Sequence, residues 1–232
     1  MSETRYGVYY TPSSTSTLGQ FGSSWLGRDC NANVDVRRLK LNGVNEAWQM
    51  EMTKVPRHYG FHGTLKAPFH TPSGVAFEVL NDAIGAFSEH HAAFEMPPLE
   101  LSILDGFIAL RPQKECKAIN AFAANCVRAF DPFRLAPTPK EMAKRLKMKL
   151  SERQKQHLKT WGYPYVMGDF QFHMTLTDRL DPYDLDIVFT ALNHHLEDVL
   201  DQQPWTFDSL TLVQQKTPKS MFEVVKRFSL SR

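Results

Sequence analysis

Short runs of apolar and β-branched residues alternate with stretches in which apolar positions recur every three or four residues. The first pattern is typical of strands and the second of amphipathic helices. In the stretch 75–91, apolar residues share one helical face: Val79, Leu80, Ala83, Ile84 and Phe87. Over the first 132 residues the pattern predicts strands at 6–10, 59–68, 94–104 and 107–110, and helices at 75–91 and 115–130.

Gly, Pro, Ser and Thr mark the predicted connections. Asp105-Gly106 separates two predicted strands, and this dipeptide suits the tight turn of a hairpin. The stretch 11–27 is rich in Ser, Thr and Gly and is predicted to be a long loop. Residues 133–139, FRLAPTP, fit neither pattern and form a predicted linker. Beyond it the sequence predicts a helix at 140–161, a strand at 170–179, a helix at 185–200 and strands at 205–214 and 221–230.

The order strand, helix, strand, strand therefore occurs twice, and the pentapeptide Phe-His-x-Thr-Leu opens each copy. His173 follows His62 by 111 residues, and the same offset places Trp205 opposite Phe94 in the strands that follow. Such self-similarity indicates an internal duplication. We predict an α+β fold in which one domain, 1–232, has two pseudo-symmetric lobes of antiparallel sheet and helices around a central cleft. The repeats are predicted at about 59–132 and 140–232, with the linker at 133–139.

Composition limits the class of protein. The chain has 232 residues, 42 % hydrophobic and 22 % charged, which is typical of a globular domain with its own core. Three cysteines without a CxxC pair predict neither a disulfide framework nor a thiolate zinc site. The start of the sequence lacks the apolar segment of a signal peptide, and no run is long enough to span a membrane. We expect a soluble, cytoplasmic protein, with a monomer favoured.

Each pentapeptide carries an imidazole and a hydroxyl two positions apart, and residues i and i+2 of a strand share a face. Imidazole titrates near neutrality, so His62 and His173 facing one cleft can serve as general base and general acid. Thr64 and Thr175 can donate hydrogen bonds to the oxygens of an anion. A phosphodiester suits this set, particularly a cyclic one. The sequence therefore predicts catalytic His62 and His173 and substrate-binding Thr64 and Thr175, without a metal ion or other cofactor.

Further residues are predicted around this site. Lys66, at i+4 from His62, is expected to share its face and to neutralise phosphate charge, and Thr177 takes the equivalent position in the second strand, with Arg179 beyond it. Tyr9 is predicted to bind substrate, and the rim is expected to include Tyr9, Arg28, Arg57 and Tyr163. His58 and His62 could suggest a metal pair, but no carboxylate accompanies them, so a metal site is not predicted.

The paired motifs HGTL and HMTL, in a chain predicted to be bilobal and α+β, resemble the two-histidine (2H) phosphoesterase superfamily. This superfamily includes RNA 2′,5′ ligase-like proteins and cyclic nucleotide phosphodiesterases. The strings RHYGFHGTLKAPF, SSWLGRDC and WGYPYVMGDFQFHMTLTDRL are more similar to its bacterial branch encoded beside phosphonate-degradation genes. The resemblance implies two lobes around a cleft, catalytic His62 and His173, phosphate-binding Thr64 and Thr175, and a place in phosphonate or ribose cyclic phosphate metabolism.

One basic segment leaves a second class of partner open. Residues 140–161 hold eight Lys and Arg side chains on a predicted amphipathic helix. A solvated helix covering one lobe is the favoured interpretation, and an RNA-binding surface is the alternative. The predicted substrate is therefore a small cyclic phosphate or phosphodiester. The alternatives are an RNA 2′,3′-cyclic phosphodiesterase or 2′,5′-ligase-like enzyme, and a protein that binds a phosphorylated metabolite without turnover.

Overall fold

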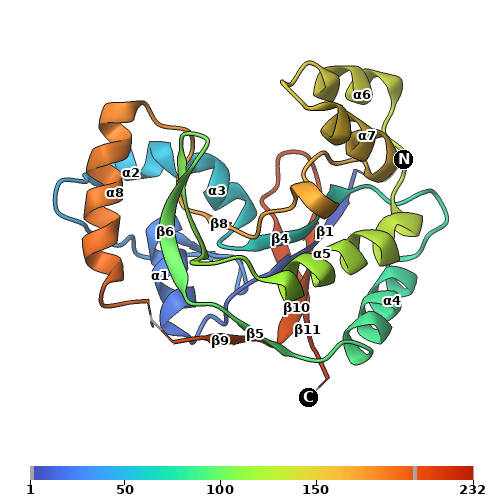
Figure 1. Ribbon diagram of the computed structural model, residues 1–232, viewed down its shortest axis with the longest axis horizontal. Coiled ribbons are helices and arrows are strands. Elements are labelled where there is room, and N and C mark those ends of the chain that lie inside the picture. The colour runs from blue at the N-terminus through green and yellow to red at the C-terminus, as the bar shows by residue number, and fades with distance from the viewer. Residues whose placement is uncertain (1–2, 201–202, 232) are drawn as a thin grey trace.

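The computed structural model describes residues 3–200 and 203–231 as a mixed α+β fold around an antiparallel sheet (Figure 1). The strand order is β11-β10-β1-β4-β8-β7-β6, and every neighbouring pair is antiparallel. The strands are β1 Arg5–Tyr10, β4 Gly63–Phe69, β6 Leu99–Leu104, β7 Phe107–Pro112, β8 Met174–Thr175, β10 Ser209–Gln215 and β11 Glu223–Ser229.

Two small sheets and the helices complete the fold. β2 Arg28–Asp29 pairs with β3 Val34–Asp35, and β5 Phe94–Met96 pairs with β9 Trp205–Phe207. The helices are α1 Thr17–Leu26, α2 Glu46–Met52, α3 Lys54–Tyr59, α4 Phe77–Glu89, α5 Lys117–Phe130, α6 Pro139–Leu146, α7 Glu152–Trp161 and α8 Pro182–Leu196, with short 3-10 turns at Asp131–Phe133 and Met167–Asp169. Within the described ranges, none of the helices is long and apolar enough to cross a membrane.

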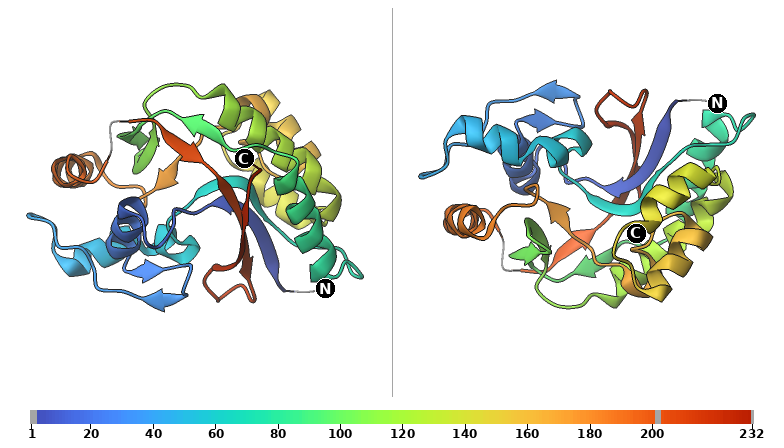
Figure 2. Two further views of the ribbon diagram at one scale, coloured as in Figure 1. Left: turned by 90° about the horizontal axis from the view of Figure 1, so that it is seen from below. Right: turned by 90° about the horizontal axis from the view of Figure 1, so that it is seen from above.

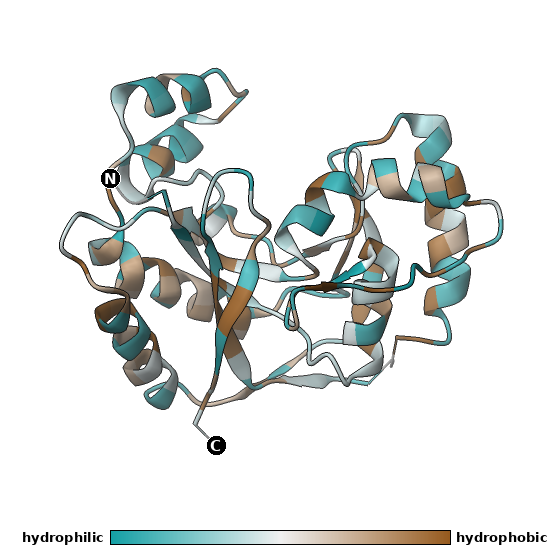
Figure 3. Ribbon diagram, turned by 180° about the vertical axis from the view of Figure 1, so that it is seen from behind, coloured by the Kyte–Doolittle hydropathy of each residue, from teal (hydrophilic) through white to brown (hydrophobic). Residues whose placement is uncertain are grey.

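The helices cover the sheet from both ends of the molecule (Figures 1 and 2). α4 and α5 lie together at one end, where α4 packs on β10 and β11 and α5 on β4, whereas α8 packs on β6 and β7 at the other end. Apolar residues concentrate on the interior strands, and hydrophilic residues cover much of α6 (Figure 3). One apolar cluster runs through the sheet, with Val8, Leu65, Met174 and Leu212 among its buried members.

Two ladders join segments that are 111 residues apart in the sequence. In the β4–β8 ladder, Gly63 lies directly opposite Met174. In the β5–β9 ladder, Phe94 lies opposite Phe207, Glu95 opposite Thr206 and Met96 opposite Trp205, so that Glu95 faces the residue 111 positions further along. Both ladders therefore bring corresponding parts of the two predicted repeats into contact.

The predicted loop at 11–27 is wrong, because most of it forms α1. The Ser16 hydroxyl accepts a hydrogen bond from the Gly19 N–H, and Gly27 ends the helix at a φ of 71°. Apolar residues along α1, Phe21 and Trp25 among them, are buried in the core. Because the stretch is rich in Ser and Gly, the helical spacing of these apolar residues is not evident in the sequence. Gly22 is required by packing, since a Cβ atom there would lie 2.0 Å from the Phe61 ring.

Other predicted elements are also wrong in their bounds. The strands expected at 94–104 and 205–214 are each split in two, into β5 and β6 and into β9 and β10, which belong to different sheets. The helix expected at 140–161 is two helices, because Ser151 and Gln154 form a capping box that starts α7. The strand expected at 59–68 begins only at Gly63, after α3 ends at Tyr59. The strand expected at 170–179 shrinks to β8 because the chain then leaves the ladder, with the Asp178 N–H donating to Met52 O.

Other predicted elements are confirmed. The hairpin at Asp105-Gly106 joins β6 to β7, and both turn residues have positive φ, 50° and 86°, as a tight hairpin turn requires. The helices expected at 75–91, 115–130 and 185–200 correspond to α4, α5 and α8. α8 begins after Asp181, whose carboxylate accepts hydrogen bonds from the first turn.

Candidate active site

Both His-x-Thr motifs line one cavity of about 380 Å³, called here the histidine cavity. Its walls come from β1, α3, β4, the start of β7, the segment around β8 and the loop after α7. The polar or titratable side chains that line it are Tyr9, Tyr59, His62, Thr64, Tyr163, His173, Thr175, Thr177, Asp178 and Arg179. The structure thus brings together two imidazoles and two threonines that are far apart in the sequence.

The two motifs lie side by side because their central residues pair with each other in the β4–β8 ladder. Gly63 lies between His62 and Thr64, Met174 lies between His173 and Thr175, and the two central residues are opposite each other in the ladder. Gly63 has no side chain, and a Cβ atom there would lie 2.6 Å from the Phe172 ring. A side chain at this position would therefore clash with the ring of Phe172, the residue before His173.

Both imidazoles are fixed by the same local hydrogen bond. His62 Nδ1 lies 2.8 Å from Gly60 O, and His173 Nδ1 lies 2.8 Å from Gln171 O. A carbonyl oxygen only accepts, so each Nδ1 carries a proton and each neutral ring keeps a basic Nε2. The Thr64 Oγ1 is 3.0 Å from Nε2 of His62, and in this tautomer the hydroxyl donates to that nitrogen. Each ring therefore offers one nitrogen for proton transfer.

Burial lowers the pKa of both histidines. The pKa of His62 falls to about 4, mainly through burial; the hydrogen bond to Gly60 opposes this shift and the charge of His173 adds to it. Burial also lowers the pKa of His173, and the hydrogen bond to Gln171 opposes that shift. Both rings are consequently neutral at pH 7 in the ligand-free protein. A bound phosphate would raise both pKa values, because a negative charge favours imidazolium.

Tyr9 supports the ring of His62. The two ring centroids are 3.9 Å apart with an interplanar angle of 23°, and Tyr9 is 1 % exposed. Tyr9 also packs with Val213 and Phe222 in a small apolar cluster. Its hydroxyl is buried and has no hydrogen-bond partner among the described residues. The structure therefore places Tyr9 in the predicted site, with the stacked ring as its visible contribution.

The prediction that Lys66 shares the face of His62 is wrong. Tyr9 pairs with Thr64, but Val8 pairs with Lys66, so an extra residue is inserted in β4 between the two pairs. Such a bulge reverses the alternation of side chains, and Lys66 lies on the core face with Val8. Its ammonium is 3.1 Å from Val127 O and 3.2 Å from Asp131 Oδ1. Lys66 does not line the histidine cavity.

Thr177 and Arg179 lie in the histidine cavity as predicted, but with partners of their own. The Thr177 hydroxyl accepts a 2.9 Å hydrogen bond from the Ile108 N–H, and the residue is 1 % exposed. This hydrogen bond ties the chain after β8 to β7. The role of Thr177 in substrate binding stays a prediction. Arg179 forms an exposed ion pair with Asp105 in the turn of the β6–β7 hairpin.

Of the other residues expected at the rim, one lines the histidine cavity and two do not. Tyr163 lines the histidine cavity, whereas Arg28 is 2 % exposed and donates to Phe222 O. Arg57 pairs with Asp35 and is not among the lining residues. Sequence reasoning missed Tyr59 and Asp178. The sequence pattern places Tyr59 in a strand, but Tyr59 is the last residue of α3. The Gly60 that follows it is a signal for a helix end.

His58 does not form a metal pair with His62. It lies on α3, and its Nε2 is 2.9 Å from the amide nitrogen of Gln215, which donates to it. No group of three or more His, Cys, Asp or Glu side chains within residues 3–200 and 203–231 is placed to hold a metal ion.

Comparison with known families places the chain. A family model described as "Protein of unknown function (DUF1045)" matches residues 64–223. The chain belongs to this family. The match begins within the first motif, at Thr64, and includes the second motif, the helical pair α6–α7 and most of the sheet.

Two curated relatives of this DUF1045 chain are both named "Ribose 1,5-bisphosphate phosphokinase PhnN". The protein from Janthinobacterium sp. (strain Marseille) is 36 % identical over 99 % of this chain and 51 % of its own length. The protein from Laribacter hongkongensis (strain HLHK9) is 32 % identical over 85 % of this chain and 46 % of its own length. The chain therefore spans about half the length of these relatives.

Among solved structures, TT0787 of Thermus thermophilus aligns with a TM-score of 0.46 at 13 % identity, over 97 % of both chains. A structure titled "Crystal structure of phosphoesterase" aligns with a TM-score of 0.37 at 12 % identity, over 74 % of this chain and 78 % of the other. Both scores lie below 0.5.

Proposed function

We propose that this chain is a metal-independent phosphodiesterase of the 2H type that acts on a cyclic phosphate or another small phosphodiester. One observation carries the proposal: His62 and His173 line the same cavity, each with Nδ1 held by a backbone carbonyl and Nε2 left for proton transfer. A pair of imidazoles, one neutral and the other protonated once the bound phosphate has raised its pKa, supplies general base and general acid chemistry.

In the proposed reaction, one imidazole takes a proton from water as the water oxygen attacks phosphorus. The other imidazole enters the step protonated and gives its proton to the leaving oxygen as the P–O bond breaks. His62 has the more strongly lowered pKa, to about 4, and we assign it the role of base and His173 that of acid. Thr175 donates a hydrogen bond to a phosphate oxygen. The Thr64 hydroxyl, which donates to His62 Nε2 in the ligand-free protein, turns to another phosphate oxygen and so frees that nitrogen to accept the proton from water.

An internal duplication is part of the proposal. It is supported by the ladders in which Gly63 faces Met174 and Glu95 faces Thr206, because each residue faces its own counterpart 111 positions away. The packing of α4 on β10–β11, and of α8 on β6–β7, also supports it. In each case the helix of one predicted repeat covers the hairpin of the other. Two repeats exchanged in this way would be related by a local twofold axis through the Gly63–Met174 pair.

The names of the relatives favour a small phosphorylated sugar as the substrate. Both are named as kinases of ribose 1,5-bisphosphate, and this chain corresponds to about half of each. We therefore favour a ribose-derived cyclic phosphate. The basic helices α6 and α7 keep RNA 2′,3′-cyclic phosphodiesterase or ligase activity as a second candidate.

A substrate panel tests the proposal. Purified protein in EDTA would be given ribose 1,2-cyclic phosphate, nucleoside 2′,3′-cyclic phosphates, diesters derived from phosphonates and short RNAs with cyclic phosphate ends, and the products followed by phosphorus NMR. We expect hydrolysis of a small cyclic phosphate that chelator does not abolish. Turnover of RNA ends alone would favour the second candidate. Binding without turnover of any compound would favour a non-catalytic role, and turnover that depends on a divalent ion would contradict the mechanism.

A further inference from the structure

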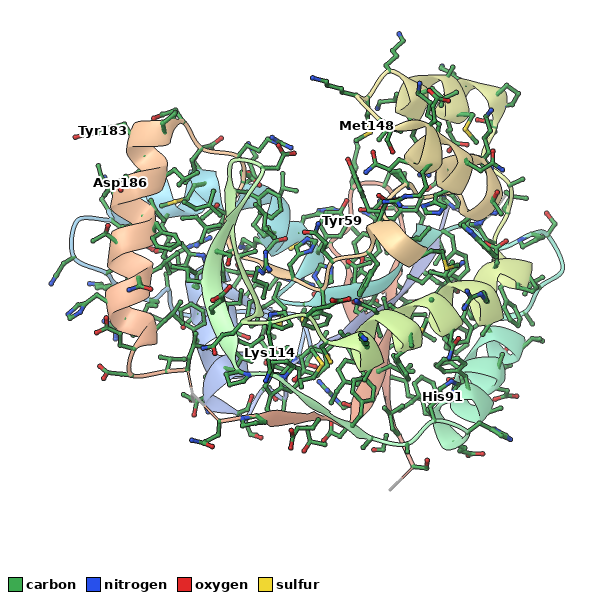
Figure 4. All side chains as sticks on the ribbon, viewed as in Figure 1. Tyr59, His91, Lys114, Met148, Tyr183 and Asp186 are labelled. Atoms are coloured by element: carbon green, nitrogen blue, oxygen red, sulfur yellow. The ribbon has the colours of Figure 1, made fainter. Side chains whose placement is uncertain are left out.

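A second cavity adjoins the histidine cavity, and its lining differs in character. Its volume is about 450 Å³, and we call it the annex. The annex lies among the start of β1, β4, the segment 134–138 and the helical pair α6–α7. Tyr59, Ala67, Pro68 and Tyr163 line both cavities, so the two spaces share a wall. In Figure 4, Tyr59 lies between the β6–β7 hairpin on one side and the helical pair, whose connecting loop carries Met148, on the other.

Positive charge dominates the lining of the annex. Arg5, Lys66, Arg134 and Arg145 contribute cationic side chains, and Glu141 contributes the one acidic side chain among the described lining residues. Asp131 lies beside the annex and binds both Lys66 and Arg134. Asp131 and Glu141 thus offset two of the four positive charges, and two remain.

Arg5 and Arg145, unlike Lys66 and Arg134, are not bound to Asp131. Arg5 donates to the side-chain oxygen of Gln215, and Arg145 donates to Gly162 O. Neither has a carboxylate within ion-pair distance in the part of the chain that the structure describes. The carboxylate of Glu141 instead accepts hydrogen bonds from the N–H and hydroxyl of Thr138, at 2.7 and 2.8 Å. Both guanidinium groups keep further N–H donors, because each carries five and these bonds use only some of them.

We propose that the annex binds a second, phosphomonoester group of the substrate while its cyclic phosphodiester lies between His62 and His173. A phosphomonoester carries nearly two negative charges at pH 7 and accepts hydrogen bonds from guanidinium groups in a planar, bidentate geometry. The excess of two positive charges matches it. The substrate class is then a sugar with both a cyclic phosphate and a separate terminal phosphate. This inference deepens the proposed function and rests on it for the cyclic phosphate alone.

The annex also gives one basic residue of α6 a role other than covering the lobe or binding RNA. Arg145 on α6 lines the annex, whereas the neighbouring Lys144 is exposed and lines neither cavity. One turn of α6 therefore carries one cation toward a cavity and one toward solvent. This provides a matched pair of variants, Arg145→Gln and Lys144→Gln, which remove the same charge from the same helix.

Calorimetric binding of ribose 5-phosphate tests the annex without catalysis. We expect Arg145→Gln and Arg5→Gln each to weaken binding about 10- to 100-fold, the value of a hydrogen bond to a charged group, and Lys144→Gln to bind as the wild type does. Arg5 and Arg145 lie on different elements, so a folding defect in one variant, seen by circular dichroism, leaves the other as the test. Equal affinity in Lys144→Gln and both arginine variants, or no binding to the wild type at millimolar concentration, would overturn the annex.

A kinetic comparison separates this inference from the proposed function. Ribose 1,2-cyclic phosphate would be compared with the same compound phosphorylated on its primary hydroxyl. We expect the phosphorylated compound to have the higher kcat/KM, and Arg145→Gln to reduce that ratio while Lys144→Gln preserves it. Hydrolysis of both compounds with a ratio near one would overturn the annex and keep the phosphodiesterase. Arginine-dependent binding of ribose 5-phosphate without hydrolysis of either compound would keep the annex and reject the phosphodiesterase.

Discussion

Gly63 and Met174 lie directly opposite each other at the centre of the sheet, and each is the residue between a histidine and a threonine. Because neighbouring residues of a strand point to opposite faces, the pairing of these two central residues places the four flanking side chains on the other face together. That face opens into the histidine cavity. The position of the proposed acid and base therefore follows from one backbone pairing.

His62 and His173 are expected to act in one step. His62→Ala and His173→Ala should each lower kcat by roughly 10²–10⁴, the usual contribution of a positioned acid or base. The double variant should lose little more than the worse single variant, because the two groups serve the same step. His194→Ala, which removes an exposed imidazole from α8, is the control. Full activity of either single variant on the best substrate would contradict the assignment.

The pH dependence of kcat/KM should be bell-shaped, with both limbs below about pH 6.5. The unperturbed pKa of imidazole would place both limbs near neutrality, but burial lowers the pKa of His62 to about 4 and lowers that of His173. Since kcat/KM reports the free enzyme, activity falls on the acid side as the base is protonated and on the alkaline side as the acid loses its proton.

The profile of kcat itself should be displaced to higher pH, because the bound phosphate raises the pKa of both imidazoles. Stopped assays from about pH 3.5 to 9, in buffers of constant ionic strength, would measure both profiles. A kcat/KM that continues to rise above about pH 7.5 would show that the pair does not titrate in this way.

The ring of Tyr9 should matter more than its hydroxyl. Tyr9→Phe keeps the stack on His62 and removes a buried hydroxyl without a described partner, so activity should change little. Tyr9→Leu removes the stack, so the His62 ring is no longer held in one orientation. We expect kcat to fall by roughly 10- to 100-fold, because small displacements of catalytic groups have effects of this size. If Tyr9→Phe instead loses as much activity as Tyr9→Leu, the hydroxyl binds the substrate directly.

The Lys66–Asp131 pair should be visible as stability. Asp131→Asn leaves the ammonium of Lys66, which is 4 % exposed, without its carboxylate, and we expect a loss of about 3–5 kcal/mol in the free energy of unfolding. Lys66→Met should cost less, because Asp131 keeps Arg134 and the methionine fills the space. Urea denaturation measures both, with Glu152→Gln in an exposed pair as control. Equal stability of Asp131→Asn and wild type would show that the pair is not held in solution.

Elements and chemistry with local signals can be predicted from the amino-acid sequence. The Asp105-Gly106 turn, the helix after Asp181-Pro182 and the strand at 6–10 each depend on neighbouring residues, and each is confirmed. The motif that carries His62 and its repeat at His173 can also be recognised in the sequence, because finding a repeated short pattern requires no knowledge of the fold.

Which of these residues share a surface depends on contacts between segments that are distant in the sequence. A one-residue bulge opposite Val8 places Lys66 on the core face. The sequence of β4 does not predict this bulge, because the register of a ladder depends on both strands. The α1 helix formed within a Ser- and Gly-rich stretch because burial of residues such as Trp25 outweighs weak local propensity. Burial likewise set the pKa of His62, and the approach of α6 to β1 placed Arg145 and Arg5 around one cavity. Packing between distant segments determines these features, and the order of residues along the chain does not encode it locally.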